Sequence, residues 1–223
     1  MKKLLLTSCL ALGLTSGLFA VTITPQATIG GGATGVTRLT VDGAPGAVNY
    51  ASSGLTITGT GNAQAVVGSL GGIHAAPYLS GANDVGFGNS AVDGYDTTRY
   101  LSTGTGSITF QFDDYQNYFG LLWGSVDTYN SLAFYDGMTL LGTLTGSNAY
   151  FTDTTGNQGQ NGTFYVNIFT DVSFDRVVAS STSYAFEIDN VAFGFVTVPD
   201  SGATFALLGL SFACLFFFRR KAA

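Results

Sequence analysis

Side chains of the types that usually catalyse reactions are scarce in this chain of 223 residues. His74 is its only histidine, and no recognisable serine elbow lies near it. Nucleophilic catalysis usually needs such a base beside its nucleophile, so we expect His74 to be a solvated loop residue. Cys9 and Cys214 lie close to the two ends, so the part between them lacks the Cys and His sets of the usual zinc sites.

Carboxylate pairs could hydrolyse a glycosidic bond, which takes one acid and one base or nucleophile. Asp113 and Asp114 are adjacent, and neighbours on a strand point to opposite faces. We expect these two residues to end a strand instead. Glu187 and Asp189 share one face, which the alternation with their apolar neighbours predicts to be the solvent face. The sequence therefore predicts a domain that is not an enzyme.

Calcium binding is an open alternative, because aspartate, asparagine and loop carbonyls supply the hard oxygen ligands that this ion prefers. Seven aspartates lie in or beside predicted turns: Asp84, Asp93, Asp96, Asp113, Asp114, Asp127 and Asp136. No sequence of the EF-hand type is present, so no coordination set follows. Aspartates are also common turn formers and solubilising charges, and on that interpretation the chain has no cofactor.

Aromatic side chains could bind sugars by stacking on them, and Trp123 is the first candidate. In the run 119–123, however, apolar residues occupy both faces of the predicted strand. Such a strand is buried on both sides. We therefore expect Trp123 to pack in the core and not to form a sugar platform.

The charge distribution restricts the partners. Between residues 21 and 202 there is no lysine, and three arginines (Arg38, Arg99 and Arg176) stand against fourteen acidic residues, which leaves a formal charge of −11. A phosphate backbone would be repelled by that field. The sequence thus indicates no nucleic-acid partner.

Strand patterns run through residues 21–197, which we predict to be one exported domain. Apolar and polar residues alternate in several short segments: 39–41, 55–57, 108–112, 164–168 and 186–195. Asp136-Gly137 separates strand-like runs at 132–135 and 138–141, which predicts a hairpin with a type I′ turn. Short strands separated by Gly, Asn and Asp turns predict an all-β fold, an antiparallel β-sandwich of the jelly-roll kind.

Residues 60–105 depart from this pattern. They are rich in Gly, Ala, Ser and Asn and contain few strand-like runs. A long irregular segment of this kind is either a functional loop or poorly ordered.

The first twenty residues have the pattern of a signal peptide. Lys2 and Lys3 precede an apolar run that extends to Phe19, and the small residue Ala20 lies at the expected cleavage point. The sequence therefore predicts export from the cytoplasm.

Residues 198–223 have three ordered features. Val198, Pro199, Asp200, Ser201 and Gly202 form a short motif; an apolar run covers 203–218; and Arg219, Arg220 and Lys221 follow it. Sixteen helical residues span about 24 Å, which modest thinning of a bilayer accommodates. The basic cluster predicts a transmembrane helix with its C-terminus in the cytoplasm.

This arrangement resembles the PEP-CTERM class of sorting signals, in a variant with Asp-Ser-Gly after the proline. The resemblance implies that an exosortase recognises the tail, which spans the inner membrane transiently and is cut near the motif. An ordinary single-pass anchor is the alternative. Residues 118–137 and 186–191 also resemble segments of one group of PEP-CTERM surface proteins, which have no established biochemical activity to carry over.

Together these features predict a protein exported through the inner membrane of a Gram-negative bacterium to the cell surface or the extracellular matrix, with a structural or adhesive, non-enzymatic role. The alternative is a calcium-assisted carbohydrate-binding module. The expected partners are an exosortase, the inner membrane and extracellular polysaccharide.

Replacement of Pro199 and Asp200 by alanine should leave unprocessed protein in the inner membrane, because the motif, the apolar run and the basic cluster act together. Cell fractionation and mass spectrometry of the C-terminal peptide measure this. A mature wild-type protein that still ended at Ala223 would contradict the prediction.

Overall fold

The structure is a computed structural model, and it describes residues 21–24, 35–42, 48–52, 54–81, 83, 94–148 and 150–196. The signal segment 1–20 with Ala20, the sorting motif 198–202, the apolar run and the basic cluster lie outside the described residues. Among the residues that are described, no helix is long and apolar enough to cross a membrane.

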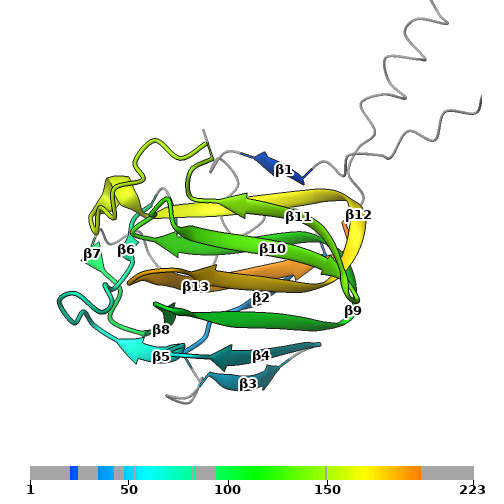
Figure 1. The fold of residues 1–223 in the computed structure, drawn as a ribbon, viewed down its shortest axis with the longest axis horizontal. Helices are drawn as coiled ribbons and strands as arrows, with labels where there is room; N and C mark the ends of the chain where they lie inside the picture. Colours follow the sequence, from blue (N-terminus) through cyan, green and yellow to red (C-terminus); the bar gives the residue numbers. More distant parts are fainter. Residues whose placement is uncertain are drawn as a thin grey trace, which may run out of the picture.

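Antiparallel strands make up nearly all of the regular structure (Figure 1). The strands are β1 (Val21–Thr24), β2 (Thr37–Leu39), β3 (Asn49–Ser52), β4 (Leu55–Thr60), β5 (Gln64–Val67), β6 (Tyr78–Leu79), β7 (Gly94–Tyr95), β8 (Arg99–Thr103), β9 (Gly106–Gly124), β10 (Asn130–Asp136), β11 (Thr139–Thr145), β12 (Phe164–Ser181) and β13 (Phe186–Gly194). One short 3₁₀ turn, η1, covers Gln160–Gly162. The predicted all-β antiparallel fold is confirmed.

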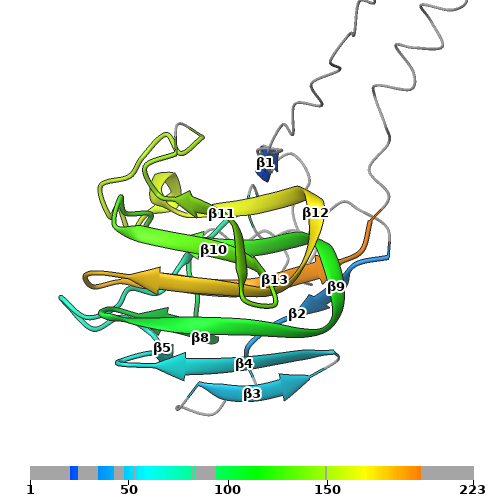
Figure 2. The ribbon, with the colours of Figure 1, turned by 45° about the vertical axis from the view of Figure 1, so that its right-hand side comes forward.

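Two long strands, β9 and β12, join two layers into a sandwich. Their residues 106–111 and 176–181 pair with each other in a layer ordered β11-β10-β12-β9-β4-β3. Their residues 118–124 and 164–170 lie in a second layer ordered β1-β12-β9-β13-β8-β5, with β2 pairing the far end of β13. Both strands curve at the same edge of the domain (Figures 1 and 2).

The core lies between the two layers and is built from the apolar positions that the alternation predicts. Phe110, Phe119 and Phe134 are fully buried, with the Phe110 and Phe119 ring centroids 5.3 Å apart. Trp123 is 0% exposed and stacks on Phe186 at 4.4 Å between centroids. The prediction that Trp123 is a core residue is confirmed.

The outer face of the second layer is buried as well, because a cover segment (residues 69–81, 83 and 94–98) lies over it. The Ala75 N–H donates to Glu187 Oε1 at 2.9 Å, and the Tyr78 N–H donates to Thr163 Oγ1 at 3.1 Å. Glu187 and Asp189 do lie on this outer face, but the prediction that the face meets solvent is wrong. Their side chains are only 1% and 2% exposed.

Two local expectations also differ from the structure. The predicted hairpin is present, but its register pairs Asp136 with Thr139, so the loop is Gly137-Met138. Only Gly137 has a positive φ there, at 55°, so the turn is not type I′. Asp113 and Asp114 do not end a strand; both are exposed within β9, between the part that pairs in one layer and the part that pairs in the other.

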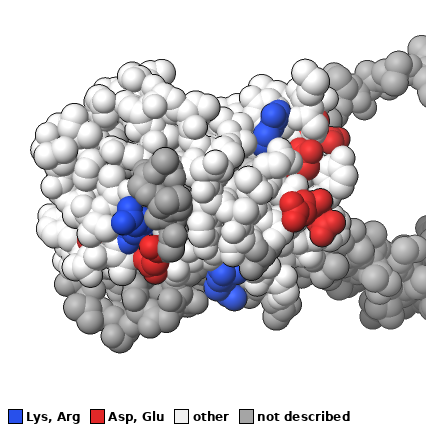
Figure 3. Space-filling view, turned by 90° about the horizontal axis from the view of Figure 1, so that it is seen from below, with Lys and Arg blue, Asp and Glu red and all other residues white. Residues whose placement is uncertain are grey.

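The surface carries few charges, as the composition requires: only 10% of the residues are Asp, Glu, Lys or Arg. Figure 3 shows one face on which uncharged side chains predominate and acidic ones gather toward one end. With no cysteine among the described residues, apolar packing and strand pairing hold this part of the chain together.

Gly120→Ala should destabilise the domain by about 1–3 kcal/mol, the usual cost of overpacking a core. A Cβ at Gly120 would meet Tyr118 Oη and lie 2.8 Å from Tyr165 Oη, and both rings are fully buried. Urea unfolding followed by Trp123 fluorescence measures the loss. Gly71→Ala is the matched control, because nothing lies within 4 Å of its added Cβ. Equal stability of the two variants would contradict the prediction.

Candidate functional site

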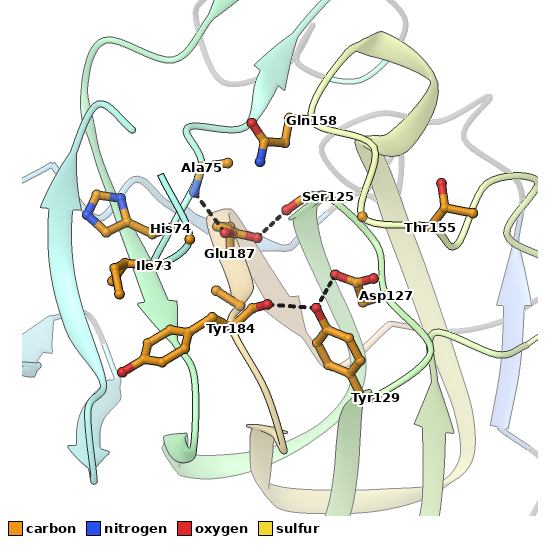
Figure 4. A pocket seen from close by; sticks show the side chains of 13 residues that line it. Ile73, His74, Ala75, Ser125, Asp127, Tyr129, Thr155, Gln158, Tyr184 and Glu187 are labelled. Carbon is orange, nitrogen blue, oxygen red and sulfur yellow. Dashed lines mark hydrogen bonds between the residues drawn. The ribbon is translucent and has the colours of Figure 1, made fainter. Parts of the chain in front are cut away.

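A polar pocket of about 210 Å³, here called the Glu187 pocket, opens at the end of the sandwich where β9 ends and β13 begins (Figure 4). Four segments that are distant in sequence form its walls: 72–75, 125–129, 155–158 and 184–187. Its lining residues are Gly72, Ile73, His74, Ala75, Ser125, Asp127, Tyr129, Thr155, Gly156, Gln158, Tyr184, Ala185 and Glu187.

Main-chain bonds fix the loop that follows β9. The Val126 N–H donates to the Gly162 carbonyl at 3.0 Å, and the Gly156 N–H donates to the Val126 carbonyl at 3.1 Å. Gly156 has a φ of 71°, and a Cβ on it would lie 2.9 Å from Asp127 Oδ2. Glycine at this position therefore leaves room for the Asp127 carboxyl in the pocket wall.

Glu187 lies at the floor of the pocket with both carboxyl oxygens engaged. Oε1 accepts the Ala75 N–H, and Oε2 accepts the Ser125 hydroxyl. Burial raises the pKa of Glu187 to about 7, although the two donors oppose that shift. This carboxyl therefore changes its charge near neutral pH.

Asp127 and Tyr129 form a second polar pair in the pocket. The Tyr129 hydroxyl lies 2.6 Å from Asp127 Oδ2 and 2.7 Å from the Tyr184 carbonyl oxygen. A phenol has one proton, so it can donate fully to only one of these acceptors. Both bonds form at once when Asp127 is protonated and donates to Tyr129. Burial raises the pKa of Asp127, and the Tyr129 hydroxyl opposes that shift.

His74 lies at the rim and is half-buried, which is not the fully solvated position expected. The Tyr100 hydroxyl donates its proton to the Gly68 carbonyl, with the two oxygens 2.6 Å apart. His74 Nδ1 lies 2.7 Å from Tyr100 Oη, so in this pair His74 Nδ1 is the donor and Tyr100 Oη the acceptor. Burial lowers the pKa of His74, which favours its neutral form. Within the described part of the chain it makes no hydrogen bond to Ser125, so no Ser-His pair is formed.

A second acidic group lies next to the pocket. Asp189, two residues after Glu187 on β13, meets Asp96 of the cover segment, and both side chains are 2% exposed. Asp96 Oδ1 accepts the Thr98 N–H at 2.7 Å and its hydroxyl at 2.6 Å. Asp96 Oδ2 and Asp189 Oδ1 are buried without a hydrogen-bond partner. Burial and the neighbouring Asp96 carboxyl hold the pKa of Asp189 well above its usual range.

The structure separates the aspartates that the sequence suggested for calcium. Asp96 and Asp127 lie at the pocket end, whereas Asp113, Asp114 and Asp136 are exposed at the opposite end. Asp84 and Asp93 lie outside the described residues. No group of three or more His, Cys, Asp or Glu side chains able to hold a metal occurs among the residues described.

Sequence reasoning missed Glu187, Ser125 and Tyr129 as pocket residues. Their positions depend on the loop after β9 and on the cover segment, which no local pattern predicts. The one available signal was that Glu187 is the only glutamate of the chain, placed among apolar residues in a strand.

The VPDSG-CTERM motif model matches residues 197–222. The chain thus carries a PEP-CTERM-like exosortase sorting signal, as the resemblance implied. This signal indicates an exported protein that exosortase-type machinery processes at the membrane. No curated protein matches the chain significantly.

Solved structures resemble the chain only weakly. Two variants of a GH87 alpha-1,3-glucanase catalytic domain, in complex with tetrasaccharides, match 69% of the chain at 11% and 10% identity, with TM-scores of 0.38 and 0.36. The chain spans only 30% of those structures. A mutant of the carbohydrate-binding module CBM29-2 matches in full over 63% of the chain, at 12% identity and a TM-score of 0.28.

Glu187→Gln should remove a pH dependence from the stability of the protein. The folded pKa of Glu187 is about 7 against an ordinary 4.5, so the folded state holds the proton more tightly. The resulting stability, on the order of 3 kcal/mol, is fully present below about pH 4.5 and is lost as the pH rises through 7. Glutamine keeps an oxygen for the Ala75 N–H but cannot ionise.

Unfolding by urea between pH 4.5 and 8.5 measures the effect as the difference between wild type and variant. Asp136→Asn, the same loss of charge at an exposed position, is the control. Parallel pH profiles for wild type and Glu187→Gln would show that this carboxyl titrates as it does in the unfolded chain.

Proposed function

We propose that the chain is an exported, non-enzymatic surface protein whose domain adheres to extracellular polysaccharide by taking one sugar unit into the Glu187 pocket. The observation that carries this proposal is the composition of the pocket rim. Thr155, Gln158 and Tyr184 are exposed there, and Asp127 and Tyr129 are half-buried. Hydroxyl, amide and carboxyl groups beside an aromatic ring suit a ligand with many hydroxyls and an apolar ring face.

The arrangement of these groups supports the same ligand class. The Tyr184 ring lies on the side of the pocket formed by Ile73 and His74, and Asp127 and Tyr129 lie on the other side (Figure 4). The Asn62 amide donates to Tyr184 Oη at 2.8 Å, which holds the ring in place. At about 210 Å³ the pocket is below the roughly 300–1,000 Å³ of sites for drug-sized ligands, which favours one sugar unit over an enclosed oligosaccharide.

The state of Glu187 supports a binding role over hydrolysis. A general acid must reach the oxygen of the leaving group, directly or through one water. Both oxygens of Glu187 are already bonded inside the protein, and its side chain is 1% exposed. The partner carboxyl, Asp127, is bonded to Tyr129. Glu187 is therefore not free to protonate a substrate, and Asp127 serves as a polar group of the wall.

The position of the pocket relative to the sorting signal suits a surface protein. The pocket lies at the start of β13, and the strand leads from there toward the motif. Glu187 and Gly194 are seven residues apart, or about 23 Å along a strand. We place the mature protein at the cell surface or in the extracellular matrix of a Gram-negative bacterium, with its pocket directed away from the attached end.

A calcium-assisted form of this binding is the second candidate, and the specific observation that favours it is the buried meeting of Asp96 and Asp189 beside the pocket. A glycan array with and without EDTA distinguishes the two forms, because only the second loses binding with the chelator.

Tyr184→Ala should lower the affinity for the sugar found on the array by several-fold to about tenfold, the equivalent of an aromatic contact of 0.5–1.5 kcal/mol. Gln158→Ala should lower the affinity by a smaller factor, because it removes only one hydrogen bond to the sugar. Isothermal titration calorimetry on the processed protein measures both.

Tyr115→Ala is the matched control, an exposed tyrosine at the opposite end of the domain. Sugar binding that the Tyr184 and Gln158 variants leave unchanged would place the ligand elsewhere. Release of new reducing ends from a bound polysaccharide would overturn the non-enzymatic part of the proposal.

A further inference from the structure

Asp96 and Asp189 bring two acidic side chains together in a buried position, which is unusual. Asp189 belongs to β13, and Asp96 belongs to the cover segment, whose main chain is held there by the Asp96 N–H bond to the Pro77 carbonyl at 2.8 Å. Both side chains are 2% exposed. A buried carboxylate is expensive unless a positive charge or hydrogen bonds compensate it.

Hydrogen bonds compensate only part of this pair. Thr98 supplies two donors to Asp96 Oδ1, but Asp96 Oδ2 and Asp189 Oδ1 accept none. Asp42, another carboxylate, also acts on Asp189. Glu187 lies two residues away on the same face of β13 and adds a further carboxyl. Asp96 and Asp42 both make the ionised form of Asp189 less stable, and the Asn190 main-chain N–H opposes them.

Either a shared proton or a bound cation can satisfy the two free oxygens. A proton would join one Asp96 oxygen to one Asp189 oxygen and neutralise one charge. A divalent cation would neutralise both charges and bind both oxygens. Since export puts the domain outside the cytoplasm, the second solution is open to any cation of the medium.

We infer that Asp96 and Asp189 bind one calcium ion, which ties the cover segment to β13. The donors are oxygens only, the kind that calcium prefers, and main-chain carbonyls and water would complete its six to eight ligands. Magnesium is less suited, because it demands a near-octahedral shell with short metal–oxygen distances, whereas calcium accepts six to eight ligands in an irregular arrangement. This inference does not rest on sugar binding in the Glu187 pocket.

The site would act on the stability of the pocket wall. Asp96 is bonded to Pro77, and Pro77 lies two residues after Ala75, whose N–H holds Glu187. A cation between Asp96 and Asp189 therefore fixes the segment that forms one side of the pocket. Without the ion the cover segment keeps its hydrogen bonds but loses its link between the two carboxylates.

The test uses the processed protein, stripped with EDTA and then titrated with calcium chloride in a calorimeter and in thermal unfolding. We expect one calcium ion per chain and a rise in Tm of about 5–10 °C at 100 times the dissociation constant. Asp189→Asn and Asp96→Asn should each abolish the calorimetric signal and the rise. Both variants should still fold, because asparagine removes a repelling charge while keeping the shape.

Asp136→Asn, at the exposed opposite end, is the control and should keep both the signal and the rise. Equal Tm shifts from calcium and magnesium would indicate screening of the acidic surface and would overturn the inference. So would the absence of a calcium signal in the wild type at neutral pH, which would leave the shared proton as the solution. Loss of sugar binding in the Tyr184 variant with calcium binding intact would separate this site from the proposed function.

Discussion

The burial of β13 on both of its faces is the constraint on which the rest of the structure depends. Its inner face packs in the sandwich core, and its outer face lies under the cover segment, so Glu187 and Asp189 are removed from water. Carboxyl groups in that position must be bonded, protonated or paired with a cation. The Ala75 N–H and the Ser125 hydroxyl donate hydrogen bonds to Glu187, whereas Asp189 lies beside a second carboxyl, that of Asp96.

The same constraint explains why an irregular segment keeps a defined place. Residues 69–81 contain little regular structure, yet they bond to the sheet beneath, as the Ala75 N–H does to Glu187 of β13. Within the cover segment β6 pairs with β7, and together with the bonds to the sheet this satisfies main-chain groups that would otherwise be buried without partners. The Glu187 pocket forms where this segment, the loop after β9 and the start of β13 come together.

The two ends of the sandwich have different surroundings. Pocket residues gather where β13 starts, whereas the strand ends near Val196, whose N–H and carbonyl are both bonded to the Asn117 side chain at 2.7 Å. These bonds hold the end of the domain next to the sorting motif of residues 197–222. Processing of the tail therefore acts on one end of the domain and leaves the pocket at the other.

The sequence by itself determined the sorting signal, the strand composition and the core, because each depends on local order or on a period of two along one strand. Phe110 is buried as its alternation predicts, and Trp123 as the apolar run on both faces of its strand predicts; the hairpin also forms, with Gly137-Met138 as its loop. Only the tertiary structure decided that the outer face of β13 is covered. Alternation tells which residues share a face but not what lies on that face, and the cover segment comes from a distant, earlier part of the chain. The pocket, the raised pKa of Glu187 and the meeting of Asp96 with Asp189 all follow from that long-range contact.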